Sequence, residues 1–179
     1  MKQINCDDLL LSKINNILKS KKIEFLGDIE FSENLDVSIL YPTDDYLLDE
    51  FQFQSIVSLL DKKDNLYVMQ LGEDSYIHSL KHELYQLGYP YSYEEYKQLN
   101  FYSISVIFSS KLDWILIIDE SLDGGIGILG GDSEIVDIFE KEYGKTKKDM
   151  CKLVKFFIED SNRNKHALLY MKKIFDLLQ

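Results

Sequence analysis

Three side chains that can bind a metal ion recur at helical spacing in one short segment. His78 and His82 are four residues apart, and Asp74 comes one turn earlier in a predicted helix over 74–88. Residues three or four apart share a helix face, so the three side chains can meet at one ion such as zinc. The order differs from the His-Glu-x-x-His of zinc proteases, because Glu83 follows the histidine pair. Histidines on a solvated polar face explain the spacing equally well, so no metal site is predicted and a small metal-dependent hydrolase stays the alternative hypothesis.

The segment DGGIGILGGD, 123–132, contains the spacing G-x-G-x-x-G in Gly125, Gly127 and Gly130. In a dinucleotide-binding fold this motif directly follows a parallel strand, opens a helix, and precedes an acid at the end of the next strand. Here ESLDG separates the preceding strand from the glycines, and the region where the acid should stand is GKTKKDMCKL, which is basic and helical in pattern. The context therefore predicts strand glycines and a strand-to-helix junction at Gly130-Gly131.

Two other ligand motifs are incomplete in the same region. Asp119, Ser121 and Asp123 match the first ligand positions of an EF-hand calcium loop, but Gly130 stands where that loop needs a glutamate. The GKT sequence that begins at Gly144 follows a predicted helix, whereas a phosphate-binding P-loop follows a strand and a glycine-rich turn. We expect no cofactor.

The familiar arrangements of catalytic nucleophiles are missing from the sequence. There is no Gly-x-Ser-x-Gly, and neither Cys6 nor Cys151 lies near a histidine in sequence. Paired carboxylates such as Glu94-Glu95 can serve acid–base catalysis, but in a chain with 31 acidic residues such pairs arise by chance. We expect that the protein is not an enzyme.

The charge is strongly polarised along the chain. Residues 1–140 hold 10 Lys or Arg and 26 Asp or Glu residues, whereas residues 141–179 hold 10 and 5, for a total of −11. A negative field of this size disfavours nucleic acid and anionic membranes as partners, and it speeds encounter with a basic protein. The same acidity can also serve only to keep a protein in solution.

Tyrosine is the unusual residue type, with six of the twelve between residues 85 and 102. Tyrosine offers a large rigid contact area with a polar tip, which suits binding interfaces, although half-buried packing explains such residues as well. We expect Tyr91 and Tyr93 to be exposed, because they lie beside Pro90 and an acid pair. The candidate partner-binding residues are Asp44, Asp45, Asp49, Glu50, Tyr91 and Tyr93.

Hydrophobic periodicity predicts a single α+β domain over 1–179, with a mainly antiparallel sheet packed by helices. Helices are expected at 7–20, from a cap at Thr43 or Asp44 to about Leu60, at 74–88, around 92–99, and three times after Asp132. The expected strands are a hairpin of 23–31 with 35–41, a strand at 66–71, and a three-stranded meander of 102–108, 113–119 and 125–129.

The sequence favours a cytosolic location. No run approaches the roughly 18 to 20 apolar residues of a membrane helix, and acids occupy the position of a signal peptide's apolar stretch. Two cysteines far apart in sequence make no disulfide framework.

The order of motifs from SYEEYKQL (92–99) through FYSISVIFSS (101–110) to LDWILIIDESLDGGIGILGGDSEIVDIFEKEYG (112–144) resembles several families of immunity proteins of bacterial polymorphic toxin systems. The resemblance covers about residues 92–143 and rests on Trp114, Gly130, Gly131 and Phe139. It implies a cytosolic protein that neutralises a cognate toxin domain by tight binding, without catalysis, and it carries over no binding residues. An acidic body suits the basic cleft of a nuclease toxin. A regulatory or adaptor module is a further alternative.

Overall fold

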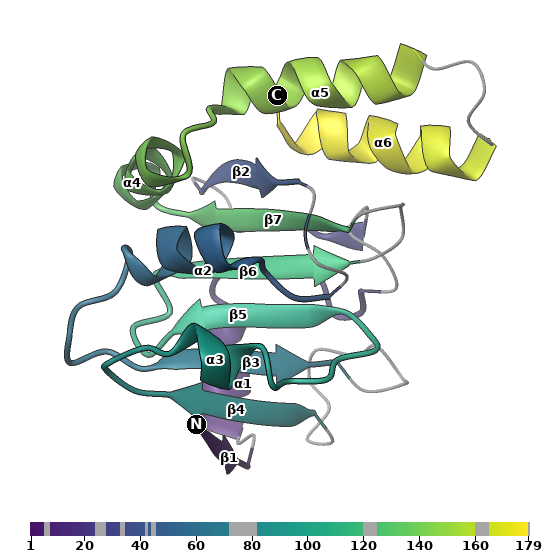
Figure 1. The fold of residues 1–179 in the computed structure, drawn as a ribbon. Coiled ribbons are helices and arrows are strands. Elements are labelled where there is room, and N and C mark those ends of the chain that lie inside the picture. Colours follow the sequence, from purple (N-terminus) through teal and green to yellow (C-terminus); the bar gives the residue numbers. More distant parts are fainter. Residues whose placement is uncertain are drawn as a thin grey trace.

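A computed structural model shows the chain as an antiparallel sheet flanked by helices (Figure 1). It describes residues 1–5, 8–23, 28–32, 35–41, 43, 46–71, 82–119, 125–159 and 165–178. The strands are β1 (Lys2–Ile4), β2 (Asp36–Leu40), β3 (Leu66–Gln70), β4 (Glu83–Leu87), β5 (Ser105–Ser109), β6 (Trp114–Asp119) and β7 (Ile126–Gly131). The helices are α1 (Asp8–Ile14), α2 (Glu50–Val57), α3 (Tyr93–Tyr96), α4 (Ser133–Tyr143), α5 (Lys147–Glu159) and α6 (Lys165–Leu177). The α+β class is confirmed.

The strand order in the sheet is β1-β4-β3-β5-β6-β7-β2, and every neighbouring pair is antiparallel. The predicted meander is confirmed as β5-β6-β7. All six residues of β6 are buried, which agrees with its apolar pattern on both faces. Each fully buried Ile or Leu of this strand contributes about 1.5–3 kcal/mol, so β6 contributes strongly to the core.

The helices form layers on the sheet. In Figure 1, α2 and α3 lie in front of the sheet and α1 lies behind it, while α5 and α6 lie side by side beyond β2. Helix α4 packs against α2, β2 and β7. One connected core runs from Leu11 on α1 to Leu178 after α6. The three C-terminal helices were expected, and Gly144, in the left-handed conformation with φ 74°, separates α4 from α5.

The predicted hairpin of 23–31 with 35–41 is wrong. Strand β2 pairs with β7, with Val37 opposite Gly130, and Phe31 instead forms an isolated bridge with Leu18. Local alternation of apolar residues indicates a strand, but it does not show with which other strand that strand pairs. Here the free edge of β7 provides the long-range pairing.

The predicted helix over 74–88 is wrong at its C-terminal end, and residues 74–81 lie outside the described part of the chain. Residues 83–87 form β4, which pairs with β3 on one side and β1 on the other. Leu84 and Leu87 are both buried and three residues apart. This spacing fits one face of a helix, and it also fits a strand in which the last residue is buried on the second face of the sheet. Pairing on both edges overrides the local helical pattern, so Gly88 does not stop a helix.

Two other helices are shorter than predicted. Helix α1 ends at Ile14, although Ile17 and Leu18 are buried as its apolar pattern indicated. Helix α2 begins at Glu50 with Asp49 as its N-cap, and not at Thr43 or Asp44. Asp49 and Gln52 form a capping box, in which each side chain accepts a hydrogen bond from the other residue's backbone N–H.

The G-x-G-x-x-G segment is a strand, as its context predicted. Gly127 and Gly130 belong to β7, which is antiparallel to both neighbours, and Gly125 precedes it. A side chain at Gly130 would stand in the ring of Phe31, with its Cβ 2.2 Å from Phe31 Cε1. The glycine therefore allows Phe31 to pack flat on the sheet.

Candidate binding surface

An acidic surface forms where three helices lie on the same face of the sheet. Helix α2 packs against α3 on one side and α4 on the other. The three helices carry more exposed carboxylates than cations, with Lys97 and Lys141 on them or at their ends and Lys145 just after α4. Two of the acids are paired: Lys97 Nζ lies 3.4 Å from Glu94 Oε2, and the N-terminal amino group of Met1 forms an ion pair with Glu95. We call this surface the acidic helical layer; its residues are Asp49, Glu50, Glu94, Glu95, Glu134, Asp137 and Glu142.

The N-terminus of α2 supplies two of these acids. Asp49 Oδ1 accepts a hydrogen bond of 2.8 Å from the backbone N–H of Gln52, so this carboxylate serves as a helix cap as well as a surface charge. Glu50 is exposed in the first helical turn, where the helix dipole favours a negative charge. Of the predicted contact residues, Asp49 and Glu50 therefore lie on the surface, whereas Asp44 and Asp45 lie outside the described residues.

Phe51 is the exposed aromatic residue of this layer. Its side chain is 57% exposed, and its ring lies 6.0 Å from the ring of Tyr143 on α4. Ile138 on α4 is 41% exposed. Large apolar side chains surrounded by charged residues are typical of the anchors of protein interfaces.

The tyrosines near α3 mainly fix the layer to the sheet. Tyr96 is buried, its ring stacks on Phe53 at 4.8 Å, and its hydroxyl accepts a 2.8 Å hydrogen bond from the backbone N–H of Leu48. These contacts connect α3, α2 and the segment before α2. They keep the acids of two helices in a constant arrangement.

Tyr91 and Tyr93 are half-buried, so the expectation that both are exposed is wrong. The Tyr91 hydroxyl lies 2.8 Å from the carbonyl oxygens of Asp61 and Asp64, and Tyr93 packs against Phe53. Burial, and then the charges of Asp64 and Asp61, raise the pKa of the Tyr91 hydroxyl. The hydroxyls of both tyrosines donate to backbone carbonyls. The sequence does not show such contacts, because the accepting residues are distant along the chain. The exposed tyrosines of the region are Tyr89, at 55%, and Tyr102, at 73%.

Helix α4 is attached to the edge strand β2 by polar contacts. Ser38 Oγ donates a 2.9 Å hydrogen bond to Glu140 Oε1, and burial raises the pKa of the Glu140 carboxyl although this hydrogen bond opposes the rise. The Tyr143 hydroxyl lies 3.2 Å from both the backbone nitrogen and the carbonyl oxygen of Tyr41. These bonds satisfy backbone groups at the sheet edge, which would otherwise be open to pairing with another chain.

A second group of charges lies in the turn before β3 and in the turn between β5 and β6. Lys111 Nζ lies 2.9 Å from Asp61 Oδ2 and 3.0 Å from Asp64 Oδ2, and these hydrogen bonds raise the pKa of Lys111 and lower that of Asp61. The side chains of Lys111 and Asp61 are open to solvent, whereas Asp64 is buried. The ion pairs of Lys111 connect the turn between β5 and β6 to the turn before β3. The Tyr91 hydroxyl connects the segment before α3 to the same turn.

Of the three candidate metal ligands, His82 alone lies within the described residues. Asp74 and His78 lie outside those residues, and His82 is buried just before β4. The buried Asp119 ends β6, and because β3 and β5 lie between β4 and β6, the backbones of His82 and Asp119 are roughly 14 Å apart. Within the part of the chain that the structure describes, no group of three His, Cys, Asp or Glu residues could hold a metal ion.

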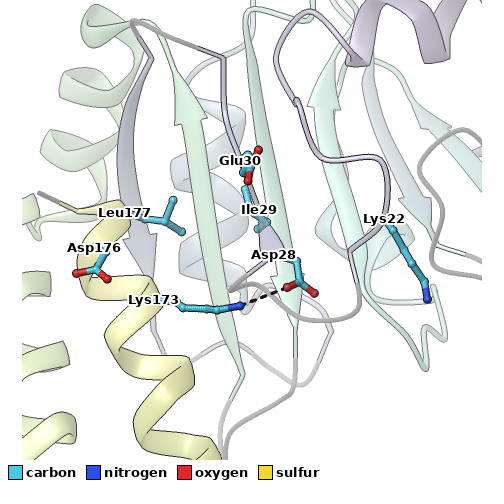
Figure 2. Close-up of a pocket in the computed structure, with 7 residues that line it drawn as sticks. All are labelled: Lys22, Asp28, Ile29, Glu30, Lys173, Asp176 and Leu177. Carbon is cyan, nitrogen blue, oxygen red and sulfur yellow. Dashed lines mark hydrogen bonds and ion pairs between the residues drawn. The ribbon is translucent and has the colours of Figure 1, made fainter.

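One pocket lies between α6 and the segment before β2 (Figure 2). Its volume is about 660 Å³, and its lining mixes both charge signs, with Lys173 Nζ 3.5 Å from Asp28 Oδ1. Ile29 and Leu177 supply the apolar part. A lining of this kind lacks the predominantly apolar surface of most small-molecule sites, and we assign no ligand to it.

Comparison of the chain with protein-family models, with curated proteins and with solved structures found no match. Among the described helices, none has the length and apolar composition needed to cross a bilayer.

Proposed function

We propose that this protein acts in the cytosol as a binding protein that neutralises a basic toxin domain through the acidic helical layer. The observation that carries the proposal is the placement of exposed carboxylates from α2, α3 and α4 on one face of the sheet. The sequence resemblance to immunity proteins suggests the class of partner.

The charge of the layer suits a basic partner. A nuclease needs a basic cleft for its own substrate, and a surface with several carboxylates in a fixed arrangement complements such a cleft. Complementary charge accelerates encounter, while desolvated apolar contacts slow dissociation. Phe51 and Ile138 provide apolar contact area among the acids.

The architecture behind the layer favours rigid docking. Asp49 caps α2, Tyr96 connects α3 to the backbone before α2, and Tyr143 connects α4 to β2. Because these contacts fix the helices before a partner arrives, less conformational entropy is lost on binding. A preorganised surface is consistent with tight inhibition of one partner.

The experiment is neutralisation in a cell. The adjacent upstream gene is sequenced first, and where it encodes a large secreted protein with a variable C-terminal domain, that domain is co-expressed with the chain. We expect growth to be restored and the two proteins to copurify. If the neighbouring gene encodes no such protein, or if its toxic domain still kills in the presence of the chain, the proposal is wrong.

A matched pair of variants tests the surface in the same assay. Glu50→Lys with Asp137→Lys reverses two acids of the layer, whereas Glu30→Lys with Asp176→Lys makes the same change of charge at the pocket near α6. We expect the first pair to lose protection and the second to keep it. Equal protection by both pairs would place the interface elsewhere.

A further inference from the structure

Helix α5 presents a basic stripe on its outward side. Lys148, Lys152 and Lys155 are exposed and spaced by four and three residues, so they share one face of the helix. Met150, Val154 and Phe157 are buried on the opposite face. The inward face fixes α5 in place. The outward face also carries two acids: Asp149, whose Oδ1 lies 3.2 Å from Lys152 Nζ, and the exposed Glu159. The three lysines therefore leave this face with a small net positive charge.

An exposed aromatic residue borders this stripe. Phe156 is 67% exposed, more than Phe51 in the acidic helical layer, and its ring lies 6.0 Å from that of the buried Phe157. Lys155 Nζ lies 5.4 Å from the ring centre of Phe175 on α6, which supports the position of that lysine. The stripe thus combines cations with an apolar anchor, the inverse in charge of the acidic helical layer.

The two surfaces of one molecule are fixed apart from each other. The ring of Phe157 lies 5.2 Å from that of Tyr41, which ties α5 to the end of β2, and α6 packs along α5. In Figure 1, α5 lies beyond the edge of the sheet, whereas α2 and α3 lie over its face. The outward lysines of α5 therefore lie apart from the acids of α2 and α3 in the same chain, while α4, which carries the other acids of the layer, directly precedes α5.

We propose that the basic stripe of one copy docks on the acidic helical layer of a second copy. Charge complementarity and an exposed phenylalanine on each surface support this occupant. The net charge of −11 opposes association at long range. At about 0.15 M salt the Debye length is roughly 8 Å, so pairs in contact outweigh distant repulsion. Self-association of this kind covers the layer until a stronger basic partner displaces the second copy.

The proposal goes beyond neutralisation of a toxin, and it stands or falls separately from it. A variant with Lys148→Glu, Lys152→Glu and Lys155→Glu keeps the acidic helical layer intact. It should lose self-association while still binding a basic partner. Loss of self-association together with loss of partner binding would contradict the toxin proposal alone. Unchanged self-association with partner binding retained would contradict the self-association proposal alone.

The test is the mass of the purified full chain by analytical ultracentrifugation at several concentrations and salt levels. The wild-type mass should rise above 21.0 kDa with concentration at low salt and fall toward it at high salt. The dissociation constant for self-association of the triple lysine variant should be about tenfold higher or more, because each of three exposed ion pairs changes this constant by a few-fold. A wild-type chain that stays monomeric at all concentrations overturns the proposal.

A mixing experiment separates the specific contact from general charge effects. A second variant carries Glu50→Lys, Asp137→Lys and Glu142→Lys, which removes most of the negative charge of the layer and leaves the basic stripe intact, whereas the triple lysine variant keeps the layer and loses the stripe. Each variant alone should be monomeric, and an equimolar mixture should form a complex. Circular dichroism checks that both variants are folded. If the mixture stays monomeric, the two surfaces do not meet.

Discussion

The ring of Phe31 lies directly over Gly130, where a Cβ would be 2.2 Å from Phe31 Cε1. Phe31 comes from the segment before β2, and Gly130 pairs with Val37 of β2. A glycine at this position of β7 therefore lets an aromatic side chain cover the sheet beside its edge strand. This contact explains why position 130 is a glycine, in a G-x-G-x-x-G spacing that is otherwise typical of nucleotide-binding loops.

Gly130→Ala should destabilise the protein by about 1–3 kcal/mol, because the new methyl group displaces the Phe31 ring in a packed region. Chemical denaturation measures the change. Gly88→Ala is the matched control, since a Cβ there meets only Asn65 Oδ1 at an ordinary 3.6 Å. In the Phe31→Ala background the cost of Gly130→Ala should fall substantially. Equal effects of the two glycine substitutions would contradict the contact.

Tyr143→Phe should lower stability by about 0.5–1.5 kcal/mol, because it removes the hydroxyl that bonds both backbone groups of Tyr41, of which the carbonyl oxygen keeps Lys145 Nζ at 3.2 Å. Urea unfolding measures this loss. Tyr102→Phe removes a hydroxyl from a side chain that is 73% exposed and should have almost no effect. If Tyr143→Phe is as mild as Tyr102→Phe, the attachment of α4 to β2 does not depend on this hydroxyl.

Glu140 should make stability depend on pH. Because burial raises the pKa of its carboxyl in the folded state, the folded chain binds more protons than the unfolded chain between the two pKa values. This contribution therefore lowers the free energy of unfolding as pH rises from about 4, the usual range for Glu, through the raised pKa.

Glu140→Gln removes this titration and keeps an oxygen that accepts from Ser38. The variant should be more stable than wild type at pH 7, and the advantage should disappear near pH 3. Unfolding curves across this pH range test it, with the exposed Glu142→Gln as control. A Glu140→Gln variant without an advantage at neutral pH would contradict the role of burial.

Metal analysis tests the alternative hypothesis of a hydrolase. We expect the purified protein to carry far less than one zinc or manganese per chain, and His78→Ala or His82→Ala to leave the content unchanged. Because His82 is buried, its substitution also affects stability, and His78→Ala is the independent check. One zinc per chain that is lost in both variants would revive the metal site.

Part of the fold followed from the sequence because its signals are local. The meander β5-β6-β7 has long apolar strands and short connections, and the C-terminal helices have regular apolar stripes with Gly144 as a terminator. Strand β4 was missed because Leu84 and Leu87 fit a helix, and only pairing with β1 and β3 decides against one. The partner of β2 was missed for the same reason.

The candidate surface was partly accessible from the sequence. Asp49 and Glu50 were found because they belong to the acidic stretch 44–50, whose charge suits a basic partner. The acids of α4 were missed because the sequence does not show that α4 packs beside α2. Phe51 was missed because its exposure depends on where α2 turns its apolar face. Tyr91 was misjudged because its partners are backbone carbonyls about 30 residues earlier.

The most direct measurement of the central claim is the association rate with the neighbouring toxin domain as a function of salt. Glu50→Lys with Asp137→Lys should slow association about tenfold or more at low salt and flatten the salt dependence, because it weakens electrostatic steering. Asp44→Lys with Asp45→Lys tests the other predicted acids in the same way. Glu30→Lys with Asp176→Lys, with the same change in net charge, should leave the rate within about twofold of wild type. If the layer variant and this control have the same rates and salt slopes, the acidic helical layer is not the binding surface.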